Sequence, residues 1–175
     1  RPGISLGAWT LPRRDLLDAL ARAVSRRRSA VTLSPDSGSP ALRRRLKGGA
    51  PYSNEQLVDW CRQVTARGIL PTVCFTMGLP FETAEDFEQT LALIRRLARA
   101  GARVVAGAYK LEPGSAVFCH PGRFGVTPYW RRFADYHEHT RRLAGGLATL
   151  HPLGFRTAAF SEGQILRMQF RAMRA

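Results

Sequence analysis

The chain has 175 residues, of which 45% are hydrophobic and 23% are charged. This composition fits one globular domain that buries roughly 70% of its unfolded surface, and it excludes a disordered tail or a collagen-like repeat. The longest stretches without a charged residue, 68–81 and 143–155, are shorter than the roughly 20 apolar residues of a membrane span, so we expect no transmembrane helix.

The charge balance is strongly basic, because 27 lysines and arginines stand against 13 aspartates and glutamates and give a formal net charge of +14. Such a balance raises nucleic acid or another polyanion as a partner. Only Lys47 and Lys110 are lysines, however, and the other 25 cationic residues are arginines. This excess of arginine indicates a compositional bias as much as a phosphate-binding surface. We expect the arginine clusters to lie on solvated helix faces, and we do not expect nucleic acid as the partner.

The three cysteines, Cys61, Cys74 and Cys119, are too few and too far apart for a disulfide framework or a paired zinc site. This usage is typical of a reducing cytoplasm, where we place the protein. His137 and His139 do not predict a metal site either, because residues two apart on a helix point about 200° apart. We therefore expect no metal ligands in this chain.

Strand-like and helix-like patterns alternate along the sequence. The predicted strands cover residues 4–9, 29–33, 70–77 and 102–109. The first predicted helix begins at Pro12, and the second covers residues 41–46. Two further helices begin at the capping pairs Ser53 with Gln56 and Thr83 with Asp86. A long loop over 110–127, a helix over 128–147 and a helix from Ser161 complete the chain.

Four strands separated by helices predict β-α-β units with right-handed crossovers. The fold class is therefore α/β, with a parallel sheet that forms part of a β/α barrel. A complete eight-stranded barrel needs about 250 residues, so the chain holds at most about half of one, plus helices at its C-terminus. We assign residues 1–127 to the half barrel and residues 128–175 to a helical extension packed on it.

Ligands of parallel β/α proteins bind at the carboxyl ends of the strands, and here these ends are polar and rich in glycine. Asp36 can accept hydrogen bonds from sugar hydroxyls, Ser34 and Ser37 can donate or accept them, and Gly78 lets a ligand approach the backbone. These residues describe a pocket for a polar small molecule. The same residue types also build ordinary turns and helix caps, so both interpretations stay open.

Three segments in this order give the sequence a recognisable pattern. They are Ser34-Pro35-Asp36-Ser37-Gly38-Ser39, then Met77-Gly78-Leu79-Pro80-Phe81-Glu82-Thr83, and then Glu112-Pro113-Gly114-Ser115. Their succession resembles the back half of the barrel of radical S-adenosylmethionine enzymes. Ser-Pro-Asp-Ser, together with Pro51-Tyr52-Ser53-Asn54-Glu55 and His120-Pro121-Gly122-Arg123-Phe124-Gly125, is most similar to members that carry a cobalamin-binding domain.

The resemblance implies that S-adenosylmethionine lies across the carboxyl ends of the strands. Its polar groups would be held by Ser34, Asp36 and Ser37, and its carboxylate by Arg43. The backbone of Thr76, Met77 and Gly78 would lie against the adenine, with Pro80 and Glu82 supporting that strand end; alternatively, Glu82 stabilises the positive N-terminus of the next helix. Leu111 and Glu112 would line the substrate side.

One departure from the family pattern concerns the 4Fe-4S cluster. Its three ligands stand in a Cys-x3-Cys-x2-Cys loop, and that spacing does not occur in this sequence. Because the chain starts at what would be the third strand, we expect it to be a piece of a longer polypeptide whose missing N-terminal part carries the loop. We assign no catalytic residue to this piece and expect it to be inactive alone.

The function expected from the resemblance is radical chemistry on a small metabolite, such as methyl transfer by a cobalamin-dependent enzyme. The chain would contribute the sites for S-adenosylmethionine and substrate. Two alternatives stay open: a radical enzyme that modifies RNA, to which the basic charge lends weight, and a non-catalytic α/β binding module that keeps the half barrel without redox chemistry.

Overall fold

The computed structural model describes residues 1–48, 52–144 and 152–175. The first part of the chain contains β1 (Ser5–Ala8), α1 (Arg14–Ala23), the 3-10 helix η1 (Arg26–Arg28), β2 (Ala30–Asp36), α2 (Pro40–Lys47), α3 (Asn54–Ala66), β3 (Leu70–Met77), α4 (Ala84–Arg99) and β4 (Arg103–Ala108). The second part contains α5 (Ala116–Cys119), the 3-10 helix η2 (Pro121–Phe124), β5 (Val126–Pro128), α6 (Phe133–Ala144), β6 (Phe155–Thr157) and α7 (Glu162–Met173).

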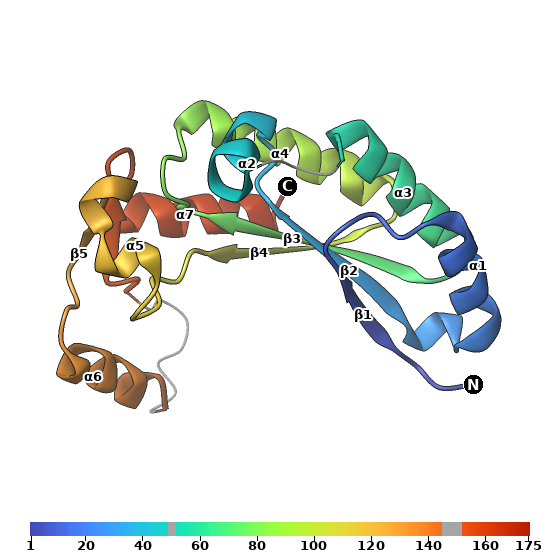
Figure 1. Cartoon of the computed structure of the whole chain (residues 1–175), viewed down its shortest axis with the longest axis horizontal. Helices are drawn as coiled ribbons and strands as arrows, with labels where there is room; N and C mark the ends of the chain where they lie inside the picture. The colour runs from blue at the N-terminus through green and yellow to red at the C-terminus, as the bar shows by residue number, and fades with distance from the viewer. Residues whose placement is uncertain (49–51, 145–151) are drawn as a thin grey trace.

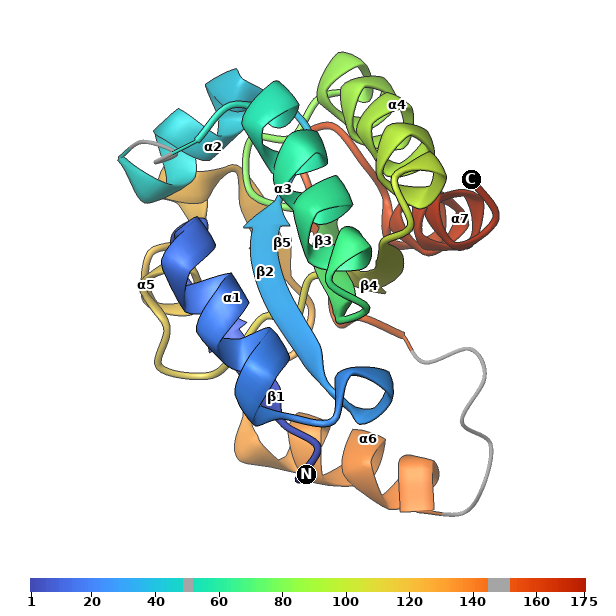
Figure 2. The ribbon, with the colours of Figure 1, turned by 90° about the vertical axis from the view of Figure 1, so that its right-hand side faces the viewer.

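The first four strands form one sheet in the order β1-β2-β3-β4, and all three neighbouring pairs are parallel. The order follows the sequence, so each connection returns the chain to the same end of the sheet. Figures 1 and 2 show α1, α3 and α4 along one face of this twisted sheet. The predicted α/β class with a partial barrel of parallel strands is confirmed.

The hydrophobic core lies between the sheet and these helices. Alternate residues of each strand point into it, and in β3 these are Val73, Phe75 and Met77, all buried. Buried side chains of α3 and α4, such as Leu57 and Leu91, pack in the same cluster. The strand pattern therefore decides which face the helices cover.

The opposite, inner face of the sheet carries mostly small and polar side chains together with the exposed apolar Leu70 and Val105. It includes the residues whose positions alternate with those of the core, namely Ser5, Gly7, Ala30, Thr32, Ser34, Leu70, Thr72, Cys74, Thr76, Arg103, Val105 and Gly107. Ser5, Ser34 and Val105 on this face are exposed. The inner face is thus open to solvent at several points along the strands.

Helix starts agree with the sequence because capping is local. Ser53 with Gln56 and Thr83 with Asp86 form the predicted capping boxes. A third box, Ser161 with Gln164, begins α7 at the expected residue. Each box satisfies free backbone N–H groups in the first turn of its helix.

Three predicted boundaries are wrong. Residues 34–36 were expected in a loop but belong to β2, because Asp36 pairs with Phe75 after a register shift that follows Leu33. The expected helix over 128–147 begins only at Phe133, since residues up to Pro128 form β5. Its expected end lies outside the described residues. The expected loop over 110–127 also contains α5 and η2.

The C-terminal residues pack on the last strands of the sheet. Helix α7 contacts β4 and β3, and its Ile165 and Met168 are buried, whereas Met173 is exposed. Strands β5 and β6 pair in antiparallel fashion, which joins residues 126–128 to residues 155–157. The division of the chain at residue 127 stays a prediction. Within the described residues, every helix is too short or too polar to cross a membrane.

Candidate functional site

The carboxyl ends of β2, β3 and β4 meet at one edge of the sheet. Asp36 pairs with Phe75 of β3, and Met77 pairs with Ala108 of β4. The Tyr109 N–H extends this pairing by donating to the Met77 carbonyl at 2.7 Å. The first two segments that carried the resemblance therefore lie side by side, although about forty residues separate them in the sequence.

Asp36 and Ser34 are held by one lysine. The Lys47 ammonium lies 2.6 Å from a carboxylate oxygen of Asp36 and donates to the Ser34 carbonyl at 3.0 Å. Asp36 also has a φ of 64°, in the left-handed region that aspartate tolerates better than most residues. Ser34 is exposed and Asp36 is half-buried, so the edge presents a hydroxyl and a carboxylate to a ligand.

Ser37 lies inside the protein. Its hydroxyl is 3.2 Å from the hydroxyl of Thr90 in α4 and accepts a hydrogen bond from the Ser39 N–H at 3.0 Å. The neighbouring Gly38 N–H donates to the same Thr90 hydroxyl at 2.8 Å. These bonds fix the turn after β2 to α4 and engage the Ser37 hydroxyl, whose part in cofactor binding stays a prediction.

Arg43 is a buried cation, and some of its guanidinium N–H groups have no hydrogen-bond partner among the described residues. Arg43 is in α2, only 3% of the residue is exposed, and Nη2 donates to the side-chain oxygen Oδ1 of Asn54 at 2.6 Å. Its guanidinium lies 5.8 Å from the centre of the Tyr52 ring. Within the described residues, Nε and Nη1 have no hydrogen-bond partner. A buried guanidinium with free N–H groups is suited to an anionic group such as a carboxylate.

Glu82 supports the turn that follows β3. Its carboxylate accepts hydrogen bonds from the N–H groups of Gly78 at 2.6 Å and Leu79 at 3.2 Å. Glu82 is 1% exposed, and this burial raises the pKa of its carboxyl group to about 7 despite the two N–H donors. The N-terminus of α4 is capped by Thr83 and Asp86. These contacts agree with a supporting role for Glu82 at the strand end.

The other residues at the end of β3 and in the turn after it differ in how accessible their side chains are. Thr76 is half-buried on the inner face, whereas the Met77 side chain is fully buried in the core and leaves only its backbone for contact. Pro80 is buried as well. Gly78 has a φ of 77°, and a Cβ there would lie 2.5 Å from Ile165 of α7, so glycine is required on two counts.

The two residues expected on the substrate side differ in burial. Leu111 is buried in the core cluster, whereas Glu112 is exposed beside it. Lys47, Asn54 and Thr90 were not assigned from the sequence, although they hold Asp36, Arg43 and Ser37 respectively. Asn54 belongs to the Pro51-Tyr52-Ser53-Asn54-Glu55 segment of the resemblance, but that segment does not show that Arg43 is its partner.

The cysteines do not gather into a cluster site. Cys61 is buried, which raises the pKa of its thiol to about 12, while Cys74 is half-buried and Cys119 is exposed. In the part of the chain that the structure describes, no three His, Cys, Asp or Glu side chains could hold a metal ion together. The residues present therefore do not fit a 4Fe-4S cluster, which needs grouped thiolates.

Comparison with known proteins gives a family but no near relative. No curated protein matches the sequence. The chain is similar to Streptococcus suis SuiB, with 13% identity and a TM-score of 0.40 over 85% of this chain, and it spans 38% of that protein. It is also similar to a GH128 (subgroup I) endo-beta-1,3-glucanase from Amycolatopsis mediterranei, with 14% identity and a TM-score of 0.38 over 94% of this chain and 74% of that one.

The sequence itself is more informative than these structural similarities. The sequence model of the radical SAM superfamily matches residues 7–94, which is half of the chain and includes the segments after β2 and β3. The chain belongs to the radical SAM superfamily.

Proposed function

We propose that this chain binds S-adenosylmethionine across the carboxyl ends of β2, β3 and β4 and shapes the substrate pocket of a cobalamin-dependent radical methyltransferase or a related enzyme. The observation that supports the cofactor site most directly is the pair of opposite charges at this edge. Asp36 offers a carboxylate, and Arg43 offers the N–H groups of Nε and Nη1. S-adenosylmethionine has a ribose diol for the first and a carboxylate for the second.

In this proposal, the turn after β3 contacts the adenine of S-adenosylmethionine. Glu82 holds the Gly78 and Leu79 amides and so fixes the backbone turn against which the adenine would lie. Ser34 and Thr76 add hydroxyls on the inner face between the two strand ends. In an enzyme whose other residues held a 4Fe-4S cluster, the bound S-adenosylmethionine would be the source of a 5′-deoxyadenosyl radical. The residues of this chain bind and orient it.

The choice of reaction has weaker support than the choice of cofactor. Cobalamin use and methyl transfer to a small metabolite are supported only by the resemblance of three segments to cobalamin-binding members: Ser34-Pro35-Asp36-Ser37, Pro51-Tyr52-Ser53-Asn54-Glu55 and His120-Pro121-Gly122-Arg123-Phe124-Gly125. Glu112, exposed after β4, is the residue that we place nearest the substrate. We also place the enzyme in the cytoplasm, in keeping with its free thiols.

The cofactor site is tested by S-adenosylmethionine binding to the gene product that contains these residues, purified without oxygen and loaded with iron and sulfide. Asp36→Asn and Arg43→Met each weaken binding by tenfold or more, because each removes a charge-assisted hydrogen bond worth about 1.5–3 kcal/mol. Arg44→Met, an exposed neighbour on α2, is the matched control and changes binding less than twofold. Equal losses in all three variants would contradict the site.

The reaction class is tested on the same preparation. Iron of about four atoms per polypeptide, bound cobalamin and release of 5′-deoxyadenosine under reduction would support the radical methyltransferase. Iron and 5′-deoxyadenosine without cobalamin would leave a radical enzyme of another kind. The absence of iron and of cofactor cleavage would favour the binding-module alternative.

A further inference from the structure

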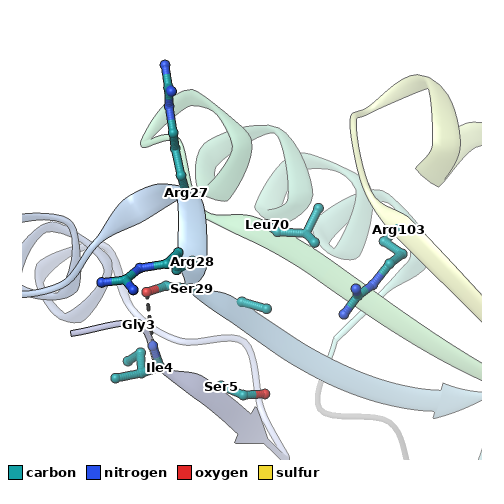
Figure 3. A pocket seen from close by; sticks show the side chains of 9 residues that line it. Gly3, Ile4, Ser5, Arg27, Arg28, Ser29, Leu70 and Arg103 are labelled. Atoms are coloured by element: carbon teal, nitrogen blue, oxygen red, sulfur yellow. Dashed lines mark hydrogen bonds between the residues drawn. The ribbon is translucent and has the colours of Figure 1, made fainter.

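Two residues near the carboxyl ends of the strands have a strained backbone. Within the described residues, only Asp36 and Phe81 combine a side chain with a positive φ, and the angle is 64° in both. Asp36 ends β2, and Phe81 lies in the turn after β3. At the amino ends of the strands, by contrast, the guanidinium groups of Arg28 and Arg103 point apart and do not form a joint ligand site (Figure 3). Strain of this kind is concentrated at functional sites, which agrees with a ligand at the carboxyl ends.

Phe81 is the more strained of these two residues. Aspartate tolerates the left-handed region, whereas in a bulky residue this φ brings the Cβ close to the following carbonyl oxygen with no compensating hydrogen bond from the side chain. A residue keeps such a conformation only where its surroundings hold it in place. The contacts of the Phe81 side chain must therefore outweigh the strain of its backbone.

The ring of Phe81 has two partners from different elements. The guanidinium carbon of Arg45, in α2, lies over the ring at 3.6 Å from its centre. The ring of Phe124, in η2, has its centre 6.0 Å from that of Phe81 and is tilted by 37°. Cation–π and aromatic contacts are both favourable. Figure 1 shows α2 and the segment around α5 on either side of the turn after β3, so these three side chains join elements that follow β2, β3 and β4.

The backbone of Phe81 determines the geometry of the turn that the adenine would contact. The next residue is Glu82, whose carboxylate accepts hydrogen bonds from the N–H groups of Gly78 and Leu79. The Glu82 N–H donates to the Leu79 carbonyl at 3.1 Å and closes the turn. A change of φ at Phe81 would move Glu82 away from these partners. The contacts of the Phe81 ring therefore stabilise the same turn that the Glu82 carboxylate stabilises from within.

We infer that Phe81 is a positioning residue for the adenine part of S-adenosylmethionine. The contacts of its ring with Arg45 and Phe124 keep residues 78–82 in the conformation whose backbone the adenine meets. Phe81 acts through the backbone of this turn and not by touching the reacting atoms. The inference rests on the proposed cofactor site and adds to it a residue whose side chain has no polar group.

The first measurement needs no ligand and uses the gene product that contains these residues. Hydrogen exchange of the peptide segment with Gly78 and Leu79, read by mass spectrometry, reports how often the turn opens. Phe81→Leu and Phe81→Gly should each speed this exchange at least tenfold, whereas Phe81→Tyr, which keeps the ring, should change it less than threefold. Glycine adopts a φ of 64° without strain, so its effect isolates the loss of the ring. Circular dichroism shows whether each variant is folded.

The second measurement compares two ligands that share the adenine, namely S-adenosylmethionine and 5′-deoxyadenosine, which has no carboxylate. Phe81→Leu should weaken both about tenfold, because fewer molecules keep the turn in the binding conformation, and Phe81→Tyr should restore both. Arg43→Met should weaken S-adenosylmethionine alone. Phe133→Leu is the matched control, since Phe133 is an exposed aromatic residue of α6, and it should change either affinity less than twofold.

The two measurements separate failure of the inference from failure of the proposed function. Unchanged exchange in both Phe81→Leu and Phe81→Gly would overturn the inference, whatever the chain binds. Faster exchange with unchanged affinity for both ligands would overturn it as well, and so would a loss confined to S-adenosylmethionine. A natural chain that binds neither ligand would contradict the proposed cofactor site, and with it any role of Phe81 toward adenine, even where the exchange shows that Phe81 holds the turn.

Discussion

The buried carboxyl group of Glu82 makes the stability of the chain depend on pH in a predictable direction. Its pKa is about 7 in the folded chain, against the ordinary 4.5, because burial disfavours the charged form. Between these two values the folded chain keeps a proton that the unfolded chain has lost. The free energy of unfolding therefore falls as the pH rises from about 4.5 to about 7, and the contribution of Glu82 levels off above that.

The size of this effect follows from the shift itself. A difference of about 2.5 pKa units, at 1.36 kcal/mol per unit, corresponds to about 3 kcal/mol. Glu82→Gln removes the titration while keeping an oxygen that can accept from the Gly78 or Leu79 N–H. The stability of the variant relative to the natural chain should thus rise by about 3 kcal/mol between pH values of about 4.5 and 8.

Urea unfolding at a series of pH values measures this difference, because all other titratable groups are shared by both chains and their contributions cancel. Glu85→Gln is the matched control, since Glu85 is exposed in the first turn of α4. Its stability relative to the natural chain should stay constant within about 0.5 kcal/mol. A Glu82→Gln chain whose relative stability does not change with pH would refute the reasoning from burial.

Two other substitutions test the turn after β2. Lys47→Met breaks a partly exposed ion pair, so it should lower the free energy of unfolding by less than about 1 kcal/mol. Because the substitution frees Asp36, calorimetry should show that S-adenosylmethionine binds severalfold more tightly. Weaker binding would contradict this prediction. Gly38→Ala places a Cβ 2.5 Å from the Thr90 Cα, a backbone atom that cannot yield, and should cost about 2 kcal/mol or more in urea unfolding. Gly107→Ala, with nothing within 4 Å, is its control.

The sequence predicts those features of the fold that depend on neighbouring residues. Strand β3 has the predicted bounds because its residues are nearly all apolar and glycine lies on both sides of it. The capping boxes at Ser53 and Thr83 are correct because each depends on two side chains three residues apart. Patterns of this length need no knowledge of the rest of the chain.

Features of the fold that depend on residues far apart in the sequence could not be predicted from such local patterns. Serine, proline and aspartate favour a turn at residues 34–36, yet pairing with Phe75 keeps Asp36 in β2. The burial of Ser37 depends on Thr90, which is more than fifty residues away. For the same reason the motif predicts a ligand at the carboxyl ends of the strands, but it does not show which polar side chains there are accessible.

The positions of the charges give the net charge of +14 a more specific meaning than a general affinity for polyanions. At the carboxyl ends of the strands, Asp36 is paired with Lys47 and Arg43 lies close by in the same short helix, so both signs are present. A ligand that carries both a cation and a carboxylate is matched to this end of the strands. Salt should therefore weaken S-adenosylmethionine binding only slightly, because screening acts on the net charge that a ligand brings to its site.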